Sequence, residues 1–183
     1  MKRSILLLFS LLVLTACKSD DSFKIDSKNE NDNFLKVGNK NIQLQSGSLQ
    51  NLGVFKEDIS DFVLNLFSSD FKFSNGKPKF EDSLTSGITV DLYVKNPSQL
   101  VLSSYKKVSY QEISDNSFEA LNIAINYDFK NEKGITRRIT QGTINVLKVG
   151  PEYEFEFSGI DNKGEKVVFF YRGKLLEINS GAF

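Results

Sequence analysis

The stretch that decides the fold is FEALNIAINYDF, residues 118–129. From Leu121 onward a large apolar side chain occupies every second position, and the positions between carry small or polar side chains. A period of two is typical of a β-strand, because successive side chains of a strand point to opposite faces. The alternation therefore predicts one apolar face on this strand, made of Leu121, Ile123, Ile125, Tyr127 and Phe129.

The same period recurs along most of the chain. Three further apolar faces are expected, from Ile88, Val90, Leu92 and Val94, from Phe62, Leu64 and Leu66, and from Tyr153, Phe155 and Phe157. Strands with one apolar and one polar face are typical of antiparallel sheets. No long stretch has helical periodicity, although residues 55–67 would also suit a helical turn.

Turn signals fall between these strands. NEKG (131–134) and DNKG (161–164) end in glycine, which supplies the positive φ that a type I turn with a following bulge needs. The segment VGPE (149–152) joins the two expected hairpins. At Gly142 the apolar phase of the strand changes, which predicts a β-bulge or a bend where the strand crosses to another part of the sheet.

These patterns predict an all-β fold, either an antiparallel β-sandwich or a meander β-barrel, with a lipocalin-like barrel as an alternative. The strand KVVFFYRG (166–173) is apolar on both faces, so we expect it in the middle of the sheet or covered by another segment. We expect a single all-β domain over residues 34–183, because the chain is too short for two ordinary domains.

The N-terminus carries a different signal. Lys2 and Arg3 precede an apolar run, residues 5–14, which at about ten residues is too short to cross a bilayer. Residues 1–16 are therefore predicted to form a signal peptide. The sequence Leu14-Thr15-Ala16-Cys17 resembles the lipobox of bacterial lipoproteins, and this resemblance implies that Cys17, the only cysteine, receives a diacylglycerol and usually a further acyl chain such as palmitate.

Polar and charged residues follow the cysteine up to residue 33, so residues 17–33 are expected to form a lipidated flexible tether. The sequence Lys18-Ser19-Asp20-Asp21 is similar to the acidic export signal of Bacteroidetes-type lipoproteins. That resemblance implies an outer-membrane lipoprotein displayed on the cell surface. An anchor that faces the periplasm stays the alternative.

A second resemblance covers residues 142–175. The pattern Tyr-x-Phe-x-Phe, Asp-x-x-Gly and Tyr-x-Gly is similar to the C-terminal hairpins of small Bacteroidetes lipoproteins of uncharacterised function. It implies a fold type and no activity.

The composition excludes several kinds of chemistry. The chain has no histidine, and its one cysteine is assigned to lipid, so triads, histidine-ligated zinc and thiol redox chemistry are not expected. No phosphate-binding glycine loop occurs. The 23 basic residues balance 23 acidic ones, which gives no basic surface for nucleic acid. We therefore expect no enzyme, no cofactor and no metal.

Three sets of polar residues are candidate functional sites. Glu152, Glu154 and Glu156 share one strand face at roughly 7 Å spacing, which suits some glycosidases but is more simply a solvent face with cross-strand cations. The DNKG loop offers oxygen ligands for calcium, yet its lysine and its spacing favour a plain turn. Arg137 and Arg138 should point to opposite faces of their strand.

Asp82-Ser83-Leu84 is similar to the acceptor tripeptide of Bacteroidetes-type O-glycosylation, which makes Ser83 a candidate glycosylation site in a turn-like segment. Most of the sixteen phenylalanines fall on alternating positions and are expected in the core.

The preferred hypothesis is a lipid-anchored, non-catalytic binding or accessory module of the cell envelope, with a glycan or protein ligand. A lipocalin-like carrier of a small apolar ligand is the alternative, and a large apolar interior cavity would favour it.

Overall fold

The computed structural model describes residues 33–179 apart from residues 75, 76 and 97. The predicted signal peptide and nearly all of the tether lie outside the described residues, together with Cys17, Lys18, Ser19, Asp20 and Asp21. The described part holds thirteen strands and one 3-10 helix, and no α-helix, so the all-β prediction is confirmed. The elements are β1 (Phe34–Val37), β2 (Lys40–Gln43), β3 (Ser46–Lys56), β4 (Ile59–Phe67), β5 (Phe71–Ser74), β6 (Lys77–Phe80), β7 (Thr85–Val94), β8 (Ser103–Lys107), η1 (Tyr110–Glu112), β9 (Ser117–Asp128), β10 (Lys133–Lys148), β11 (Tyr153–Asp161), β12 (Lys166–Gly173) and β13 (Leu176–Asn179).

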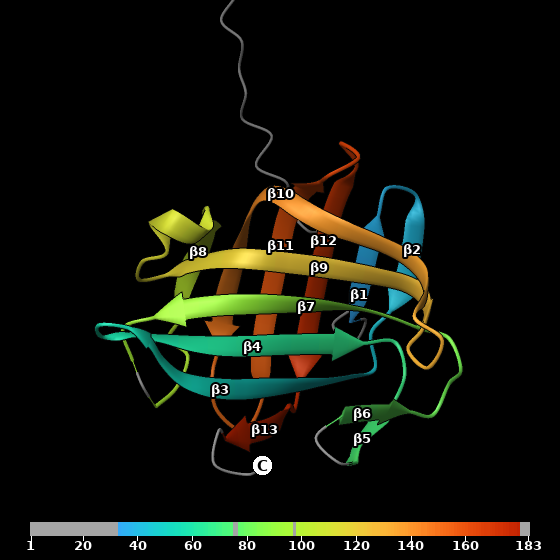
Figure 1. Cartoon of the computed structure of the whole chain (residues 1–183), viewed down its shortest axis with the longest axis horizontal. Coiled ribbons are helices and arrows are strands. Elements are labelled where there is room, and N and C mark those ends of the chain that lie inside the picture. The colour runs from blue at the N-terminus through green and yellow to red at the C-terminus, as the bar shows by residue number, and fades with distance from the viewer. Residues whose placement is uncertain (1–32, 75–76, 97, 180–183) are drawn as a thin grey trace, which may run out of the picture. The chain divides into compact units, whose positions relative to one another are not determined.

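Eleven of the described strands form one sheet, in the order β13-β3-β4-β7-β9-β8-β10-β11-β12-β1-β2, while β5 and β6 pair as a separate hairpin. Most neighbours are antiparallel; β13 with β3 and β8 with β9 are parallel. The sheet curls over itself, so that β3, β4, β7 and β9 run across the direction of β11 and β12 (Figure 1). The two alternatives from the sequence thus resolve into a single curled sheet with two layers.

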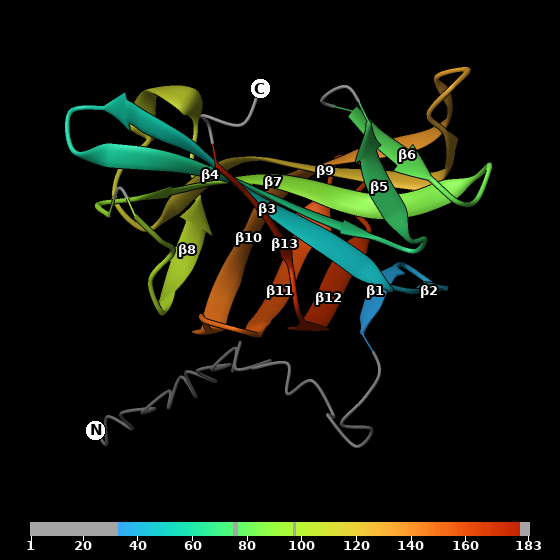
Figure 2. The ribbon, with the colours of Figure 1, turned by 90° about the horizontal axis from the view of Figure 1, so that it is seen from below.

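Strand β10 is the element that passes from one layer to the other. Its first half pairs with β9 from Lys133 to Arg138, and its second half pairs with β8 from Thr143 to Val146. The register against β11 shifts between Ile139 and Gln141, next to Gly142. The predicted bend at Gly142 is therefore confirmed, and Figure 2 shows β10 turning from the layer of β9 to that of β11.

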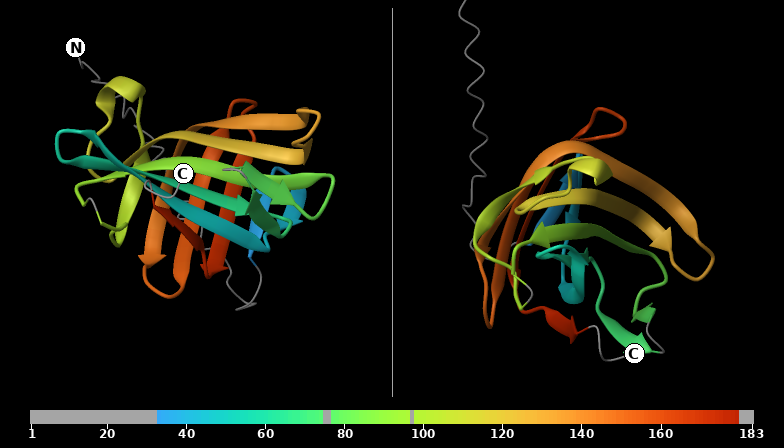
Figure 3. Two further views of the ribbon diagram at one scale, coloured as in Figure 1. Left: turned by 60° about the horizontal axis from the view of Figure 1, so that its bottom comes forward. Right: turned by 60° about the vertical axis from the view of Figure 1, so that its left-hand side comes forward.

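Two short connections join the opposite ends of the sheet. Between β2 and β3 the amide of Leu44 donates to the carbonyl of Asn33 at 3.0 Å, and the next amide, of Gln45, donates to the carbonyl of Phe67 at 2.7 Å. At the other connection, between β12 and β13, Leu175 packs against the core. Consecutive residues thus bond to distant strands, which brings the two ends of the sheet together (Figure 3).

The space between the layers is filled by the predicted apolar faces. All residues of the expected faces on β4, β7 and β11 are buried, as are Leu121, Ile123 and Ile125 of β9. The rings of Phe118 and Phe157 lie 6.3 Å apart and those of Phe157 and Phe169 lie 5.3 Å apart, so aromatic side chains from both layers meet in the middle. Dense packing of this kind is typical of a true core.

The last two members of the apolar face predicted for the opening stretch, Tyr127 and Phe129, do not lie in that core. Asn126 has a left-handed φ of 48°, and the register against β7 shifts between Thr85 and Gly87, which marks a bulge. The bulge breaks the alternation. Phe129 lies beyond the end of β9 and is 41% exposed, and Tyr127 is half-buried and touches it.

The predicted hairpins are present with one change. At 161–164 the left-handed residue is Gly164, as expected, with φ of 78°. At 131–134 the terminal Gly134 also has a positive φ, of 155°, and Glu132 adds a left-handed φ of 53° that the sequence did not predict. The ambiguous segment 55–67 forms no helix, since it contains a hairpin turn at Glu57 between β3 and β4. Strand β12 lies between β11 and β1, in agreement with its two apolar faces.

Candidate functional site

A cluster of aromatic side chains lies outside the main core, on the outer face of β4. Phe67 points away from the core, and the β5–β6 hairpin places Phe71 and Phe80 against it, with ring centroids 5.2 Å and 4.8 Å from that of Phe67. These two residues are direct cross-strand partners, so both face the sheet. Phe129 and Tyr127 join from the end of β9.

The cluster borders a cleft of about 600 Å³, here called the Phe80 cleft. Its volume is within the range of small-ligand sites. One wall is β6 with the segment that follows it, and the other is the turn between β9 and β10. The lining residues are Pro78, Lys79, Phe80, Glu81, Asp82, Ser83, Asp128, Phe129, Lys130 and Asn131.

The aromatic part of the cleft is supported from behind. The rings of Phe80 and Phe129 lie 4.6 Å apart, tilted against each other by 33°. Both rings also contact Phe67, which is only 6% exposed. Because Phe67 is fixed in the sheet, Phe80 and Phe129 cannot collapse inward, and they present a rigid aromatic surface.

The second wall is held by a carboxylate. Asp128 accepts hydrogen bonds from the backbone amides of Lys130 at 2.9 Å and Asn131 at 3.0 Å, and from the side-chain amide of Asn131 at 2.7 Å. The Asn131 bonds, led by that of its side chain, lower the pKa of Asp128. This turn keeps its shape without help from a ligand, since its polar groups are satisfied internally.

The rim of the Phe80 cleft carries charges of both signs. Lys79 and Lys130 stand beside Glu81 and Asp82, and no hydrogen bond or ion pair joins their charged ends to another residue that the structure describes. Ser83, the candidate glycosylation site, lies at the same rim and is exposed, as are its neighbours Asp82 and Leu84. The rim therefore offers donors and acceptors in similar number.

Three carboxylates gather elsewhere on the outer face. Asp61 of β4, Asp91 of β7 and Glu119 of β9 lie on neighbouring strands. Burial, and then the negative charge of Asp91, raises the pKa of Asp61 to about 6. Burial, and then the charge of Glu119, raises the pKa of Asp91. Glu119 is joined to Arg138 by a 2.9 Å ion pair, and Oδ1 of Asp61 has no hydrogen-bond partner in the described structure.

Aromatic rings border this acidic group. Tyr93 is the cross-strand partner of Asp61, and burial, followed by the charge of Asp61, raises the pKa of its hydroxyl. Phe55 packs on Tyr93 at 5.2 Å and on Tyr110 at 6.0 Å. The three carboxylates do not line the Phe80 cleft. They lie on an outer face of the sheet, which is poor geometry for paired acid–base catalysis.

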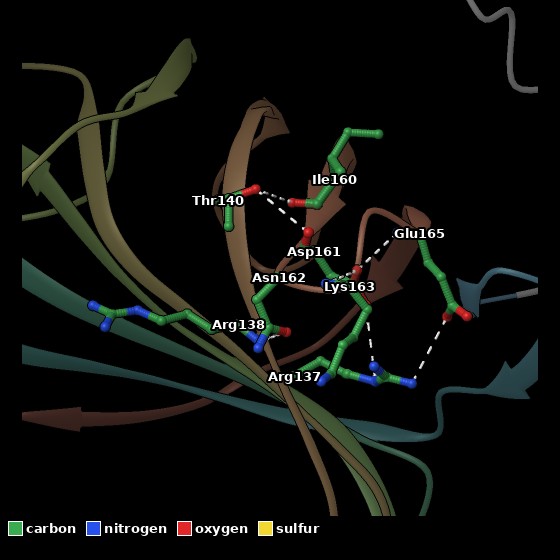
Figure 4. A network of polar contacts seen from close by, with 8 residues as sticks. All are labelled: Arg137, Arg138, Thr140, Ile160, Asp161, Asn162, Lys163 and Glu165. Carbon is green, nitrogen blue, oxygen red and sulfur yellow. Dashed lines mark hydrogen bonds and ion pairs between the residues drawn. The ribbon is translucent and has the colours of Figure 1, made fainter.

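A polar network links β10 to the β11–β12 turn (Figure 4). Asp161 is 1% exposed, and its Oδ1 accepts from the amides of Lys163 at 2.8 Å and Glu165 at 2.9 Å. Its Oδ2 lies 3.9 Å from Nε of Arg137. Arg137 and Arg138 leave the strand in opposite directions, as predicted.

This network also explains the DNKG turn. The carboxylate of Asp161 is directed at backbone donors, so it stabilises the hairpin. Among the residues that the structure describes, no group of three carboxylates, histidines or cysteines is arranged to hold a metal ion.

The row of glutamates on β11 has partners on neighbouring strands and loops. Glu154 receives a 2.8 Å bond from Arg172, Glu156 a 2.6 Å bond from Asn145, and Glu152 a 2.9 Å bond from Lys148. Of the cations expected opposite them, Arg172 pairs with Glu154. These glutamates therefore form a paired outer face, in line with the structural interpretation.

Comparison with known protein families, with curated sequences and with solved structures finds no match for this chain. Among the described residues, no helix is both long and apolar enough to cross a membrane. The Phe80 cleft, which the sequence did not predict, is the candidate site whose wall is supported by the aromatic cluster. A signal for it exists in FKFSNGKPKF (71–80), since Asn-Gly between two short aromatic runs is typical of a hairpin.

Proposed function

We propose that this chain is a lipid-anchored, non-catalytic binding or accessory module of the bacterial outer membrane, displayed on the cell surface, and that it binds its ligand in the Phe80 cleft. The observation that carries the binding role is the cleft itself: a rigid aromatic surface beside unpaired polar groups, in a volume of about 600 Å³. The lipobox-like sequence ending at Cys17 supports the proposed lipid anchor in the membrane.

The packing between the layers favours this proposal over a lipocalin-like carrier. Large side chains such as Tyr105, Phe118, Phe155 and Phe169 are completely buried there. A carrier would need that space for its ligand. Binding of a ligand in the Phe80 cleft, in contrast, requires no rearrangement of the core side chains.

The position of the carboxyl groups with raised pKa values supports a non-catalytic role. The carboxylates of Asp61 and Asp91 have raised pKa values, yet they do not line the Phe80 cleft. In the Phe80 cleft, the carboxylate of Asp128 is committed to its own turn.

Lipid attachment and membrane association are tested with the variant Cys17→Ala, in cells grown with an alkyne-tagged palmitate. We expect the wild-type protein to carry the label and to sediment with membranes, and the variant to lose both properties, because only a thiol at this position accepts the diacylglycerol. Ser19→Ala is the matched control and should keep the label. Protease added to intact wild-type cells then distinguishes the outer surface from the periplasm. A labelled, membrane-bound Cys17→Ala protein would refute the anchor.

A further inference from the structure

We propose that the ligand of the Phe80 cleft is a neutral glycan, bound by stacking of a pyranose ring on Phe129 and by hydrogen bonds to the charged rim. This inference rests on the binding role proposed above and adds the chemical class of the ligand.

Neighbouring rings hold the exposed aromatic surface of the Phe80 cleft in place. Phe129 lines the cleft and is 41% exposed, although its ring contacts those of Phe80, Phe67 and Tyr127. An exposed ring held by three others has lost its freedom before any ligand arrives, so binding costs little further ordering. The face of an aromatic ring is electronegative and attracts the weakly positive C–H groups on one side of a sugar ring.

The rim of the Phe80 cleft carries both hydrogen-bond donors and acceptors. Lys79 and Lys130 can donate hydrogen bonds, and Glu81 and Asp82 can accept them. Hydroxyl groups of a sugar both donate and accept, so each rim group can find a partner on the same ligand. The groups have no ion-pair partner among the described residues that would compete.

The charges that line the cleft disfavour other classes of ligand. The lining holds two lysines and three carboxylates, one of which, Asp128, is bonded within its own turn. This small net charge favours neither a polyanion nor a polycation strongly. A purely apolar ligand would bury these polar groups without partners, which costs several kcal/mol per group in the least favourable case. A ligand that is neutral, hydroxylated and apolar on one ring face satisfies all three conditions.

The test uses the full-length lipidated protein, extracted in a detergent without a sugar headgroup. Calorimetric titration is carried out with neutral hexopyranose oligosaccharides of α- and β-linked glucose, galactose and mannose, and with heparin and palmitate as probes of the charged and apolar classes. Saturation-transfer NMR identifies which ligand protons touch the protein. We expect at least one neutral oligosaccharide to bind, with the strongest transfer to C–H protons on one ring face.

Substitutions at Phe129 locate the binding. Phe129→Ala should weaken binding roughly tenfold, the size of one lost aromatic stack. Phe129→Tyr keeps the ring and should bind as the wild type does. The matched control is Phe55→Ala, which removes a similarly exposed ring (38%) far along the outer face, beside Tyr93, and should leave the affinity unchanged.

The outcomes separate the two proposals. If heparin or palmitate binds in a manner that depends on Phe129 and no neutral oligosaccharide does, the cleft is a binding site and the glycan inference is wrong. If a glycan binds equally well to Phe129→Ala, the stacking geometry is wrong. If no probe of any class binds in a manner that Phe129→Ala weakens, both the glycan inference and the binding role of the cleft fail.

Discussion

At the scale of single residues, Asp61 is the group whose chemistry the fold changes most clearly. In an unfolded chain its carboxyl would keep a pKa near 3.8, whereas burial and Asp91 raise it to about 6 in the folded protein. The folded state therefore holds the proton more tightly than the unfolded state. The stabilising effect of that proton is fully present below pH 3.8 and is lost as the pH rises through 6.

Asp61→Asn should remove this dependence. We expect the variant to be more stable than the wild type at pH 7.5 by roughly 1 kcal/mol, a modest value because solvent screens a half-exposed group. At pH 3.5 the two proteins should differ little. Urea unfolding at both pH values provides the measurement.

Asp91→Asn provides a linked control. It removes the charge that helps to raise the pKa of Asp61, so it should shift the pH at which stability is lost toward lower values. Equal slopes of stability against pH in the wild type and in Asp61→Asn would contradict the assignment.

At the scale of elements, the bend in β10 depends on a glycine. A Cβ atom at Gly142 would lie 2.6 Å from the ring of Phe157 and 2.8 Å from the carbonyl oxygen of Ser158. The ring belongs to the core and the carbonyl to a neighbouring strand, so neither can move away easily. The point where the chain changes layers therefore has no room for a side chain.

Gly142→Ala should destabilise the protein by about 2 kcal/mol or more. Gly150→Ala is a matched control, because its φ of 142° is close to the 157° of Gly142 but no atom lies within 4 Å of its added Cβ. The difference between the two variants in denaturant unfolding isolates the steric part. Equal losses would mean that backbone strain, and not crowding, is the cause.

The strands also differ in how well the sequence pattern predicted which side chains face the core. Alternation predicted the inward faces of β4, β7 and β11, because a residue's face depends only on its position along a regular strand. It failed at the end of β9, where the bulge at Asn126 moved Tyr127 and Phe129 to the outer cluster. A bulge depends on pairing with other strands, which the local pattern does not contain.

At the scale of the whole molecule, the connections that join the two ends of the sheet decide its shape. Leu175 lies in the connection between β12 and β13, and its Cδ2 sits 2.7 Å from the position of a Cβ on Gly47. A larger residue at Gly47 would push the connection away. The contact thus helps to hold β13 against β3.

Leu175→Ala should reduce the free energy of unfolding by about 2 kcal/mol, the lower range for loss of a leucine packed against a core. Leu176→Ala changes the next residue, which is 48% exposed, and should cost less than about 0.5 kcal/mol. Thermal and urea unfolding of the two variants give the comparison. Similar losses would show that the strand β13, and not the Leu175 contact, supplies the stability.

The amino-acid sequence by itself determined the all-β class, the apolar faces, the main turns and the bend at Gly142, because each follows from a local period or a local backbone requirement. Only the tertiary structure decided that the sheet folds over itself with its ends joined, and that Phe80, Phe129 and the charged rim meet in one cleft. Those residues come from segments about fifty positions apart, 78–83 and 128–131. Their meeting depends on where the β5–β6 hairpin packs, and no local pattern encodes a contact of that range.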